Sequence, residues 1–155
     1  MQARLNAAAA SPAAYAAMMT LEKFVKESTK LEPSLIELVK MRASQLNGCA
    51  FCIDMHSKDA RSEGETEQRL YALSAWREAP FFTAREQAAL AWTESLTLVA
   101  HDHVPDAVFE EVRPHFNDEE LVNLTLVVGA INAWNRFGVS FRMVPGAYNP
   151  PKKAK

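Results

Sequence analysis

The segment Gly48–His56 reads GCAFCIDMH, and it holds both cysteines of this 155-residue chain together with one of its four histidines. Before it, Pro33 opens a run in which apolar residues recur at helical spacing, and Gly48 ends that run as a left-handed C-terminal cap would. A further helix is predicted directly behind this glycine. In that helix the two cysteines and His56 share one face, because 3.6 residues make a turn. The segment therefore predicts two consecutive helices with both thiols at the start of the second.

Almost every other segment of the chain also reads as helix, and most of the five glycines stand where a helix would stop. A Thr-Ala-Arg-Glu pattern at residues 83–86 and an Asn-Asp-Glu-Glu pattern at 117–120 mark two helix starts. No strand, glycine-rich phosphate loop or repeat is evident. The chain is therefore expected to be all-α, a single-domain bundle of about seven helices over residues 1–155, with an irregular tail from about 145. The expected helices cover approximately residues 12–30, 33–47, 49–61, 66–77, 83–100, 105–112 and 117–142.

Composition and charge exclude several classes of function. A net charge of −2 argues against a nucleic-acid partner. The longest apolar run, about residues 124–134, is too short to cross a bilayer, and the alanine-rich N-terminus lacks the basic start and leucine-rich segment of a signal peptide. The protein is therefore expected in the cytoplasm, without a membrane partner. In that compartment a close cysteine pair is more often catalytic, redox-sensing or metal-binding than a structural disulfide.

The start of a helix suits a reactive cysteine. Its first-turn N–H groups carry partial positive charge and favour thiolate over thiol. Helix N-termini and C-x-x-C spacing lower the pKa of cysteine from about 8.5 to roughly 3.5–7.5. His56, four residues after Cys52, can accept the thiol proton. Such a thiolate would reduce a peroxide and become a sulfenic acid, which the second thiol would convert to a disulfide.

Three other interpretations of the thiol pair remain open from the residues alone. Buried cysteine behaves as a small apolar side chain, so an ordinary helix core also explains the pattern. A structural disulfide across this short loop would contribute only about 2 kcal/mol. Zinc would take both thiolates and His56, although three ligands in one short helical stretch are unusual for zinc. The candidates for a fourth zinc ligand are Glu37, His101, His103 and His115.

The run 37–56 resembles the core of the AhpD-like family, the alkyl hydroperoxidase D branch of the carboxymuconolactone decarboxylase superfamily. The family pattern is a glutamate, eleven residues and then C-x-x-C-x-x-x-H, which is far more specific than a C-x-x-C alone. Its four elements correspond here to Glu37, Cys49, Cys52 and His56. The similarity is clearest over about residues 33–100, and the segment 131–136 also resembles the late helix of small AhpD-like proteins.

The resemblance implies an all-helical protein that assembles into homo-oligomers, either trimers or hexamers. It implies thiol-dependent reduction of hydroperoxides without haem, metal or another cofactor. Cys52 would attack the peroxide and Cys49 would resolve it, while Glu37 and His56 would form the proton relay. Because the oxidised pair must be reduced by another thiol, a dithiol or thioredoxin-like electron donor is expected as a partner. The lactone-decarboxylating branches normally lack the cysteine pair, which argues against that reaction here.

Phe51 is a departure from the family pattern, because peroxidase members carry a histidine between the two cysteines. A phenyl ring cannot relay a proton, so either peroxidase activity is weak or the proton path runs through Glu37 and His56 alone. A general disulfide reductase or redox sensor with the same cysteines is an alternative function. A second alternative is a non-catalytic oligomeric binding protein with buried, unreactive thiols. Separately, the pair Phe81-Phe82 is expected to form an exposed apolar patch suited to a subunit contact.

Overall fold

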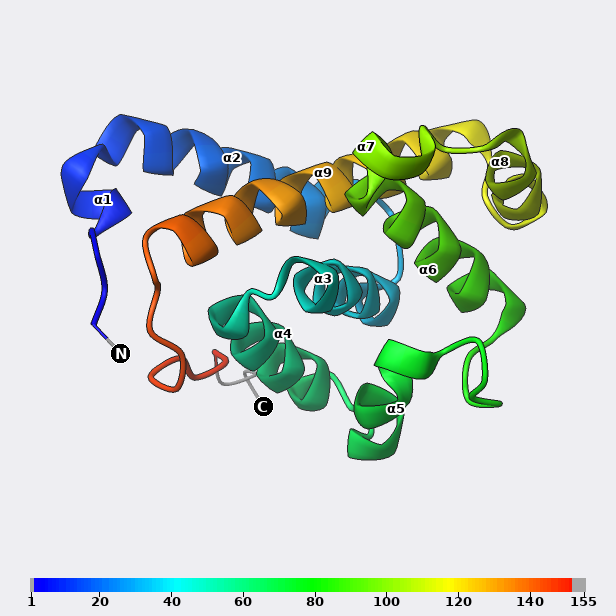
Figure 1. Ribbon diagram of the computed structural model, residues 1–155, viewed down its shortest axis with the longest axis horizontal. Helices are drawn as coiled ribbons and strands as arrows, with labels where there is room; N and C mark the ends of the chain where they lie inside the picture. The colour runs from blue at the N-terminus through cyan, green and yellow to red at the C-terminus, as the bar shows by residue number, and fades with distance from the viewer. Residues whose placement is uncertain (1, 152–155) are drawn as a thin grey trace.

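The computed structural model describes residues 2–151, and within that range the chain folds into helices joined by loops, without a β-strand (Figure 1). The elements in chain order are α1 (Ala7–Ala10), α2 (Pro12–Ser28), α3 (Pro33–Asn47), α4 (Ala50–Ser62), α5 (Glu67–Ala72), the 3₁₀ turn η1 (Leu73–Ala75), α6 (Ala84–Thr97), α7 (Val99–Asp102), α8 (Asp106–Val112), the 3₁₀ turn η2 (Arg113–His115) and α9 (Asp118–Ser140). This architecture confirms the all-α class expected from the sequence.

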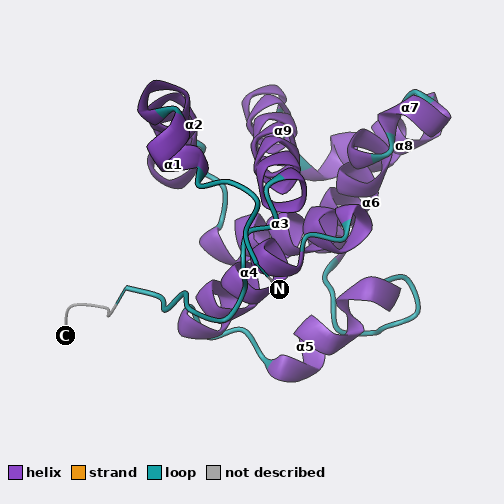
Figure 2. Cartoon of the chain, turned by 60° about the vertical axis from the view of Figure 1, so that its left-hand side comes forward, coloured by secondary structure: helices purple, strands orange, loops and turns teal. Residues whose placement is uncertain are grey.

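The centre of the fold is α3, which packs against α4, α6 and α9 (Figures 1 and 2). Nine of its 15 residues are buried, and they point in every direction from the helix axis. A helix that is buried all round belongs to the middle of a core rather than to a surface. Its apolar residues join three hydrophobic clusters: one with α6 and α9, one with α4, α5 and α6, and one around the two cysteines.

The junction between α3 and α4 is as tight as the sequence predicts. Gly48 adopts the left-handed conformation with a φ of 67°, which a residue without a Cβ reaches at little cost. Its N–H group donates to the carbonyl of Gln45, and the N–H of Cys49 donates to the carbonyl of Ser44 at 3.0 Å. Only Gly48 and Cys49 connect the two helices. The left-handed cap expected from Asn47-Gly48 is therefore confirmed.

The helices of residues 2–151 are more numerous than the seven expected, because nine α-helices and two 3₁₀ turns occur there. The alanine run Ala7–Ala10 forms a short helix because the side chain of Asn6 caps it. The helix expected to reach residue 100 ends at Thr97, and Leu98 leaves helical geometry before α7 begins. The helix expected over 66–77 ends at Ala72 and continues only as a 3₁₀ turn. Both helix starts expected at residues 83–86 and 117–120 are confirmed, and each is closed by a capping box, at the starts of α6 and α9.

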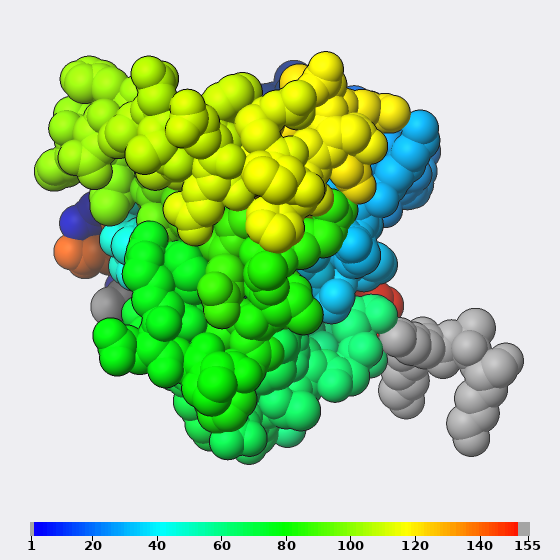
Figure 3. Space-filling model, turned by 90° about the vertical axis from the view of Figure 1, so that its right-hand side faces the viewer, coloured from blue at the N-terminus to red at the C-terminus, as the bar shows by residue number. Residues whose placement is uncertain are grey.

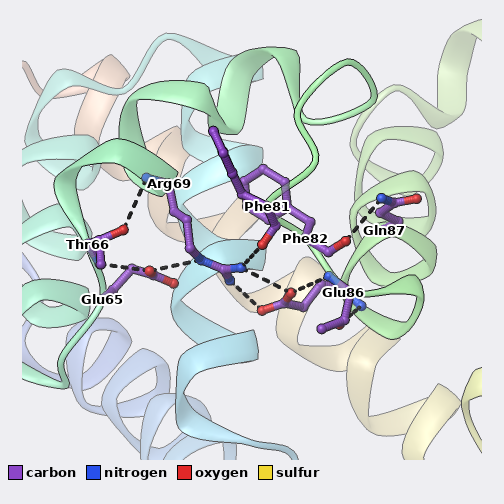
Figure 4. Close-up of polar contacts among 8 residues, drawn as sticks. Glu65, Thr66, Arg69, Phe81, Phe82, Glu86 and Gln87 are labelled. Carbon is purple, nitrogen blue, oxygen red and sulfur yellow. Dashed lines mark hydrogen bonds and ion pairs between the residues drawn. The ribbon is translucent and has the colours of Figure 1, made fainter.

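Arg69 on α5 corrects the expectation for Phe81-Phe82 (Figure 4). Its guanidinium binds Glu65 at 2.9 Å and Glu86 at 2.5 Å, and it also donates to the carbonyl of Phe81. The same guanidinium lies 4.8 Å from the ring centre of Phe82. Phe82 is consequently buried in the cluster between α5 and α6, and only Phe81 reaches the surface. The predicted two-residue apolar patch is therefore wrong, since a cation from another helix covers one ring.

The side of the molecule on which α5 and α6 lie is shown in space-filling form in Figure 3. The green atoms of α5 and α6 form its lower and middle part, and the yellow atoms around η2 and the start of α9 lie above them.

Among the helices of residues 2–151, none combines the length and the hydrophobicity needed for a membrane span.

Lys40 on the central helix is fully buried, so its ammonium group needs a partner inside the protein. Glu22 on α2 supplies it through a direct ion pair. Two charges that are both removed from water attract strongly, but removal of one leaves the other with its full desolvation cost. The pair therefore ties α2 to α3 beside the cysteine-bearing junction.

We expect Glu22→Gln to lower the free energy of unfolding by about 3–5 kcal/mol, because the buried ammonium of Lys40 would lose the carboxylate that it contacts directly. Chemical denaturation measures this loss. Glu27→Gln is the matched control on the same helix, since Glu27 forms only an exposed ion pair with Lys23, at 3.9 Å, worth less than about 1 kcal/mol. Equal, small losses in both variants would contradict this reading of the buried pair.

Candidate active site

Both cysteines lie at the start of α4, where the sequence places them. Cys49 is the N-terminal capping residue, and its Sγ accepts a hydrogen bond of 3.3 Å from the backbone N–H of Cys52. Cys52 lies in the first helical turn, where free N–H groups favour a negative charge. The two sulfurs form a disulfide across a Cα–Cα separation of 5.3 Å. This separation lies within the usual Cα–Cα range for a disulfide, so the turn at the start of α4 accommodates the bond.

His56, one turn after Cys52, is paired with Glu37 of the central helix. Its Nδ1 lies 2.8 Å from Oε2 of Glu37, and both side chains are buried. With the glutamate as acceptor, Nδ1 carries the proton and Nε2 is left to exchange one. Because α3 and α4 pack against each other, residues 19 positions apart meet in the interior. The structure therefore brings together all four residues that the sequence singled out.

The electrostatics of Glu37 reflect this partner. Burial, the largest single cause, would raise the pKa of its carboxyl group, but the hydrogen bond and the charge of His56, together with the charges of Lys40 and Lys26, outweigh burial. The net effect is a pKa below the usual value for glutamate. Glu37 is therefore a carboxylate at neutral pH and can accept the hydrogen bond from the imidazole beside it.

A cavity of about 320 Å³ gives access to this group from outside. Cys52, His56 and Glu37 all line it, whereas Cys49 does not. The exposed surface of the cavity is largely apolar, and that apolar part is formed by Tyr15, Met19, Phe51, Met55, Trp134 and Met143. Glu22, Lys26, Lys40, Asp59 and Tyr148 complete the wall. A cavity of this volume is at the lower end of the range for small-molecule sites. A larger, more open depression of about 670 Å³ at residues 113–119 contains neither a cysteine nor any of these buried charges.

Two residues of the cavity wall were missed by the sequence reasoning. Asp59 lies three residues after His56 on the same face of α4, so helical spacing gave a usable signal for it. Tyr148 belongs to the segment 143–150, here named the C-terminal strap, which has no regular secondary structure and runs back across α4. The Tyr148 hydroxyl donates to Oδ1 of Asp59 at 2.7 Å. No pattern near the end of the sequence could have revealed this long-range contact.

The strap is fixed to α4 at further points. The N–H of Gly146 donates to Oδ2 of Asp54 at 2.9 Å, and Nζ of Lys58 donates to the carbonyls of Gly146 and Tyr148. Burial raises the pKa of the Tyr148 phenol, and the hydrogen bond to Asp59 and the charges of Asp59 and Glu37 raise it further. The phenol therefore stays protonated at neutral pH and acts as a donor.

The residues that could jointly hold a cation differ from those suggested by the sequence. Within residues 2–151, potential ligand atoms of Glu37, His56 and Asp59 lie within 4.8 Å of one another, and neither cysteine belongs to this group. The histidines considered as a fourth zinc ligand lie on other elements: His101 on α7, His103 at its end, and His115 in η2.

A partly buried amide network fixes the cysteine-bearing junction to α9. The side-chain amide of Asn47 donates to Asn132 at 2.9 Å and to Asn135 at 2.8 Å. Asn135 in turn donates to the hydroxyl of Ser44 at 3.0 Å. Buried polar groups that are fully hydrogen-bonded to one another specify one arrangement of the helices that carry them. This gives a physical reason for the asparagines in the segment 131–136.

Gly138 on α9 is a third residue that the sequence reasoning missed. A Cβ atom at this position would lie 2.5 Å from the Sγ of Cys49 and 3.4 Å from that of Cys52. Such an approach is far below van der Waals contact, so the sulfur pair fits against α9 only because a glycine faces it. A glycine inside a predicted helix was the available signal, since it costs helix stability and needs a packing reason.

We expect Gly138→Ala to lower the free energy of unfolding by about 1–3 kcal/mol through overpacking and to slow disulfide formation by displacing the Cys49 sulfur. Denaturation and thiol titration measure the two effects. Gly129→Ala is the matched control on α9, because a Cβ there meets nothing within 4 Å and should stabilise the helix by up to about 1 kcal/mol. Normal disulfide formation in Gly138→Ala would show that the glycine has no role in seating the sulfurs.

The chain resembles known proteins in its sequence. Residues 12–95 match the model of the carboxymuconolactone decarboxylase family. The chain is 44% identical to the uncharacterized protein YdfG of Bacillus subtilis over 140 residues, which cover 90% of this chain and 95% of YdfG. The chain belongs to the carboxymuconolactone decarboxylase family.

Solved structures place the chain more narrowly within this family. A protein of unknown function from Agrobacterium tumefaciens, provisionally assigned to antioxidant defence as AhpD, is 46% identical. It superimposes with a TM-score of 0.89 over 97% of this chain and 100% of its own. A peroxidase-related protein from Ralstonia eutropha with an alkylhydroperoxidase AhpD core has a TM-score of 0.79 over 90% of this chain and 74% of its own. At 20% identity that second likeness shows the fold alone. The chain is thus a member of the AhpD-like branch of the carboxymuconolactone decarboxylase family, as the motif predicts.

Proposed function

We propose that this AhpD-like protein is a thiol-dependent peroxidase that reduces small organic hydroperoxides. The observation that carries the proposal is the shared cavity: Cys52 lines it together with the buried His56–Glu37 pair, whereas Cys49 lies behind Cys52 against α9. This arrangement supports the proposal that Cys52 meets the substrate and that Cys49 then reacts with Cys52.

The proposed reaction has two steps. The Cys52 thiolate attacks one oxygen of the hydroperoxide, so that an S–O bond forms, the O–O bond breaks, and the alkoxide takes a proton from His56 and leaves as an alcohol. The Cys49 thiol then attacks the sulfenic acid, giving the Cys49–Cys52 disulfide and water. Glu37 holds the imidazole by Nδ1 and stabilises its charged form in both steps. A dithiol donor, in the proposal a thioredoxin-like one, returns the disulfide to two thiols.

Burial of the sulfurs favours a small substrate over a protein disulfide. Only 1% of Cys49 and 3% of Cys52 is exposed. A small organic hydroperoxide can enter a cavity of about 320 Å³ directly, whereas a folded protein, whether a disulfide substrate or the thioredoxin-like donor, reaches the sulfurs only if the site opens. The general disulfide reductase is therefore the less favoured alternative, because both of its half-reactions need that opening. Assembly into trimers or hexamers, and a cytoplasmic location, stay part of the proposal.

Steady-state turnover tests the proposed function. The protein is supplied with dithiothreitol as a dithiol donor and with either cumene hydroperoxide or hydrogen peroxide. The rate at which the peroxide is consumed measures turnover. We expect catalytic consumption of both, with a lower KM for cumene hydroperoxide because the cavity walls are largely apolar. The absence of turnover above the rate of free dithiothreitol would reject the peroxidase.

A further inference from the structure

Asp59 and Tyr148 line the cavity, yet the proposed reaction gives them no role. On α4, Cys52, His56 and Asp59 follow one another at i, i+4 and i+7, so they lie in series along one helix face. At 1.5 Å per residue, Asp59 is about 10 Å from Cys52 along the helix axis, with His56 between them. Asp59 is thus placed to act on the imidazole rather than directly on the sulfur.

The contacts around Asp59 point the same way. Its carboxylate approaches the potential ligand atoms of both His56 and Glu37 to within 4.8 Å, so two carboxylates flank one imidazole. The Tyr148 hydroxyl donates to Asp59 at 2.7 Å. A carboxylate that accepts a hydrogen bond is stabilised in its charged form and held in one orientation. The donor comes from the C-terminal strap, which is itself fixed to α4 through Asp54 and Lys58.

We propose that Asp59 is a second carboxylate of the proton relay and that Tyr148 is a positioning residue, so that the C-terminal strap sets the reactivity of Cys52. The proposal rests on the proposed peroxidase function, in which the relay would serve the reaction at Cys52. Its chemistry is narrower: the negative charge of Asp59 stabilises the imidazolium of His56, and the imidazolium stabilises the Cys52 thiolate one turn away.

The other charged groups around the cavity leave this effect in place. From α2, Glu22 and Lys26 line the cavity, and from α3, Glu37 and Lys40 do so. Glu22 and Lys40 are bound to each other, so their charges largely cancel. Lys26 is exposed to solvent, and its charge, like that of Lys40, lowers the pKa of Glu37 and keeps that carboxyl group ionised. Glu37 and Asp59 are the two carboxylates whose potential ligand atoms lie within 4.8 Å of those of the imidazole.

The pH dependence of Cys52 alkylation by iodoacetamide tests this proposal without any peroxide. The reduced protein carries Cys49→Ser throughout, so that only one thiol reacts. Asp59→Asn removes the negative charge of the carboxylate, and Tyr148→Phe removes the hydroxyl but keeps the ring. Tyr71→Phe is the matched control, because Tyr71 is exposed and its hydroxyl donates to Glu67 on α5. We expect Asp59→Asn to raise the apparent pKa of alkylation by about half a unit to one unit, which slows the reaction about threefold to tenfold below that pKa.

Tyr148→Phe should shift the profile in the same direction by a smaller amount, and Tyr71→Phe should leave it unchanged. The imidazole of His56, followed by NMR, should titrate at lower pH in Asp59→Asn than in its parent, which provides a reading that needs no alkylation. A merely structural role would lower the melting temperature without moving either titration. Superimposable alkylation profiles and an unmoved His56 titration in Asp59→Asn would overturn the proposal, even in a protein that turns over peroxide. Shifted profiles in a protein without turnover would support it while rejecting the peroxidase.

Discussion

Replacement of Cys52 with serine is expected to abolish peroxide reduction, because no other thiol of residues 2–151 lines the cavity beside His56. A serine hydroxyl is not ionised at neutral pH and is a poor nucleophile toward a peroxide oxygen, so the rate should fall by several orders of magnitude. Turnover of cumene hydroperoxide with dithiothreitol as donor measures the loss.

Cys49→Ser is the informative companion variant. With Cys52 intact, the first step should proceed once, and the protein should accumulate a sulfenic acid on Cys52 that reacts with dimedone and is detected by its mass. The pair of variants thus assigns the two roles separately. A dimedone adduct on Cys49 in Cys52→Ser, together with retained turnover, would reverse the assignment of the attacking and resolving sulfurs.

Glu37→Gln is expected to have the second largest effect on catalysis. Glutamine preserves the shape and the acceptor for Nδ1 of His56 but removes the charge that stabilises the imidazolium. Loss of a well-placed acid–base partner typically costs about 10²–10⁴-fold in rate. We expect a fall in kcat/KM within that range, measured with cumene hydroperoxide between pH 5 and 9. Glu119→Gln is the control, because Glu119 pairs with Lys30 at the surface, and it should leave the rate unchanged.

The same variant carries a prediction for stability against pH. Because the pKa of Glu37 is lowered in the folded protein, the carboxylate contributes stability above its unfolded pKa, and this contribution is lost as the pH falls through the folded value. Glu37→Gln should therefore lose less stability than the wild type between neutral and acidic pH. If the free energies of unfolding of the two proteins fell by the same amount between neutral and acidic pH, that result would contradict the assignment of this ion pair.

Much of the site could be predicted from the sequence because its parts are local. Cys52 and His56 are one helical turn apart, and Gly48 fixes the turn before them through its own backbone preference. Glu37 was predicted to belong to the site from the spacing of a family motif and not from a physical argument, since nothing in the residues shows that α3 folds back on α4. The capping boxes of α6 and α9 were equally local and equally predictable.

The parts that could not be predicted depend on contacts distant in sequence. Phe82 reads as an exposed ring until Arg69 of another helix covers it. Gly138 reads as a weak point in a helix until the sulfurs of Cys49 and Cys52 are found against it. Tyr148 reads as part of an irregular tail until its hydroxyl meets Asp59, 89 residues earlier. In each case the sequence carries the residue but not the partner that gives it a role.

A single-turnover experiment tests the central claim most directly. The fully reduced wild-type protein is mixed with one equivalent of cumene hydroperoxide in the absence of any donor, and free thiols and cumyl alcohol are counted together. The proposed mechanism predicts that both thiols of each chain disappear, that one alcohol forms per chain, and that the product contains the Cys49–Cys52 disulfide seen in the structure. Thiols that persist while the hydroperoxide remains intact would contradict it and would leave the cysteine pair as packing for the junction of α3 and α4.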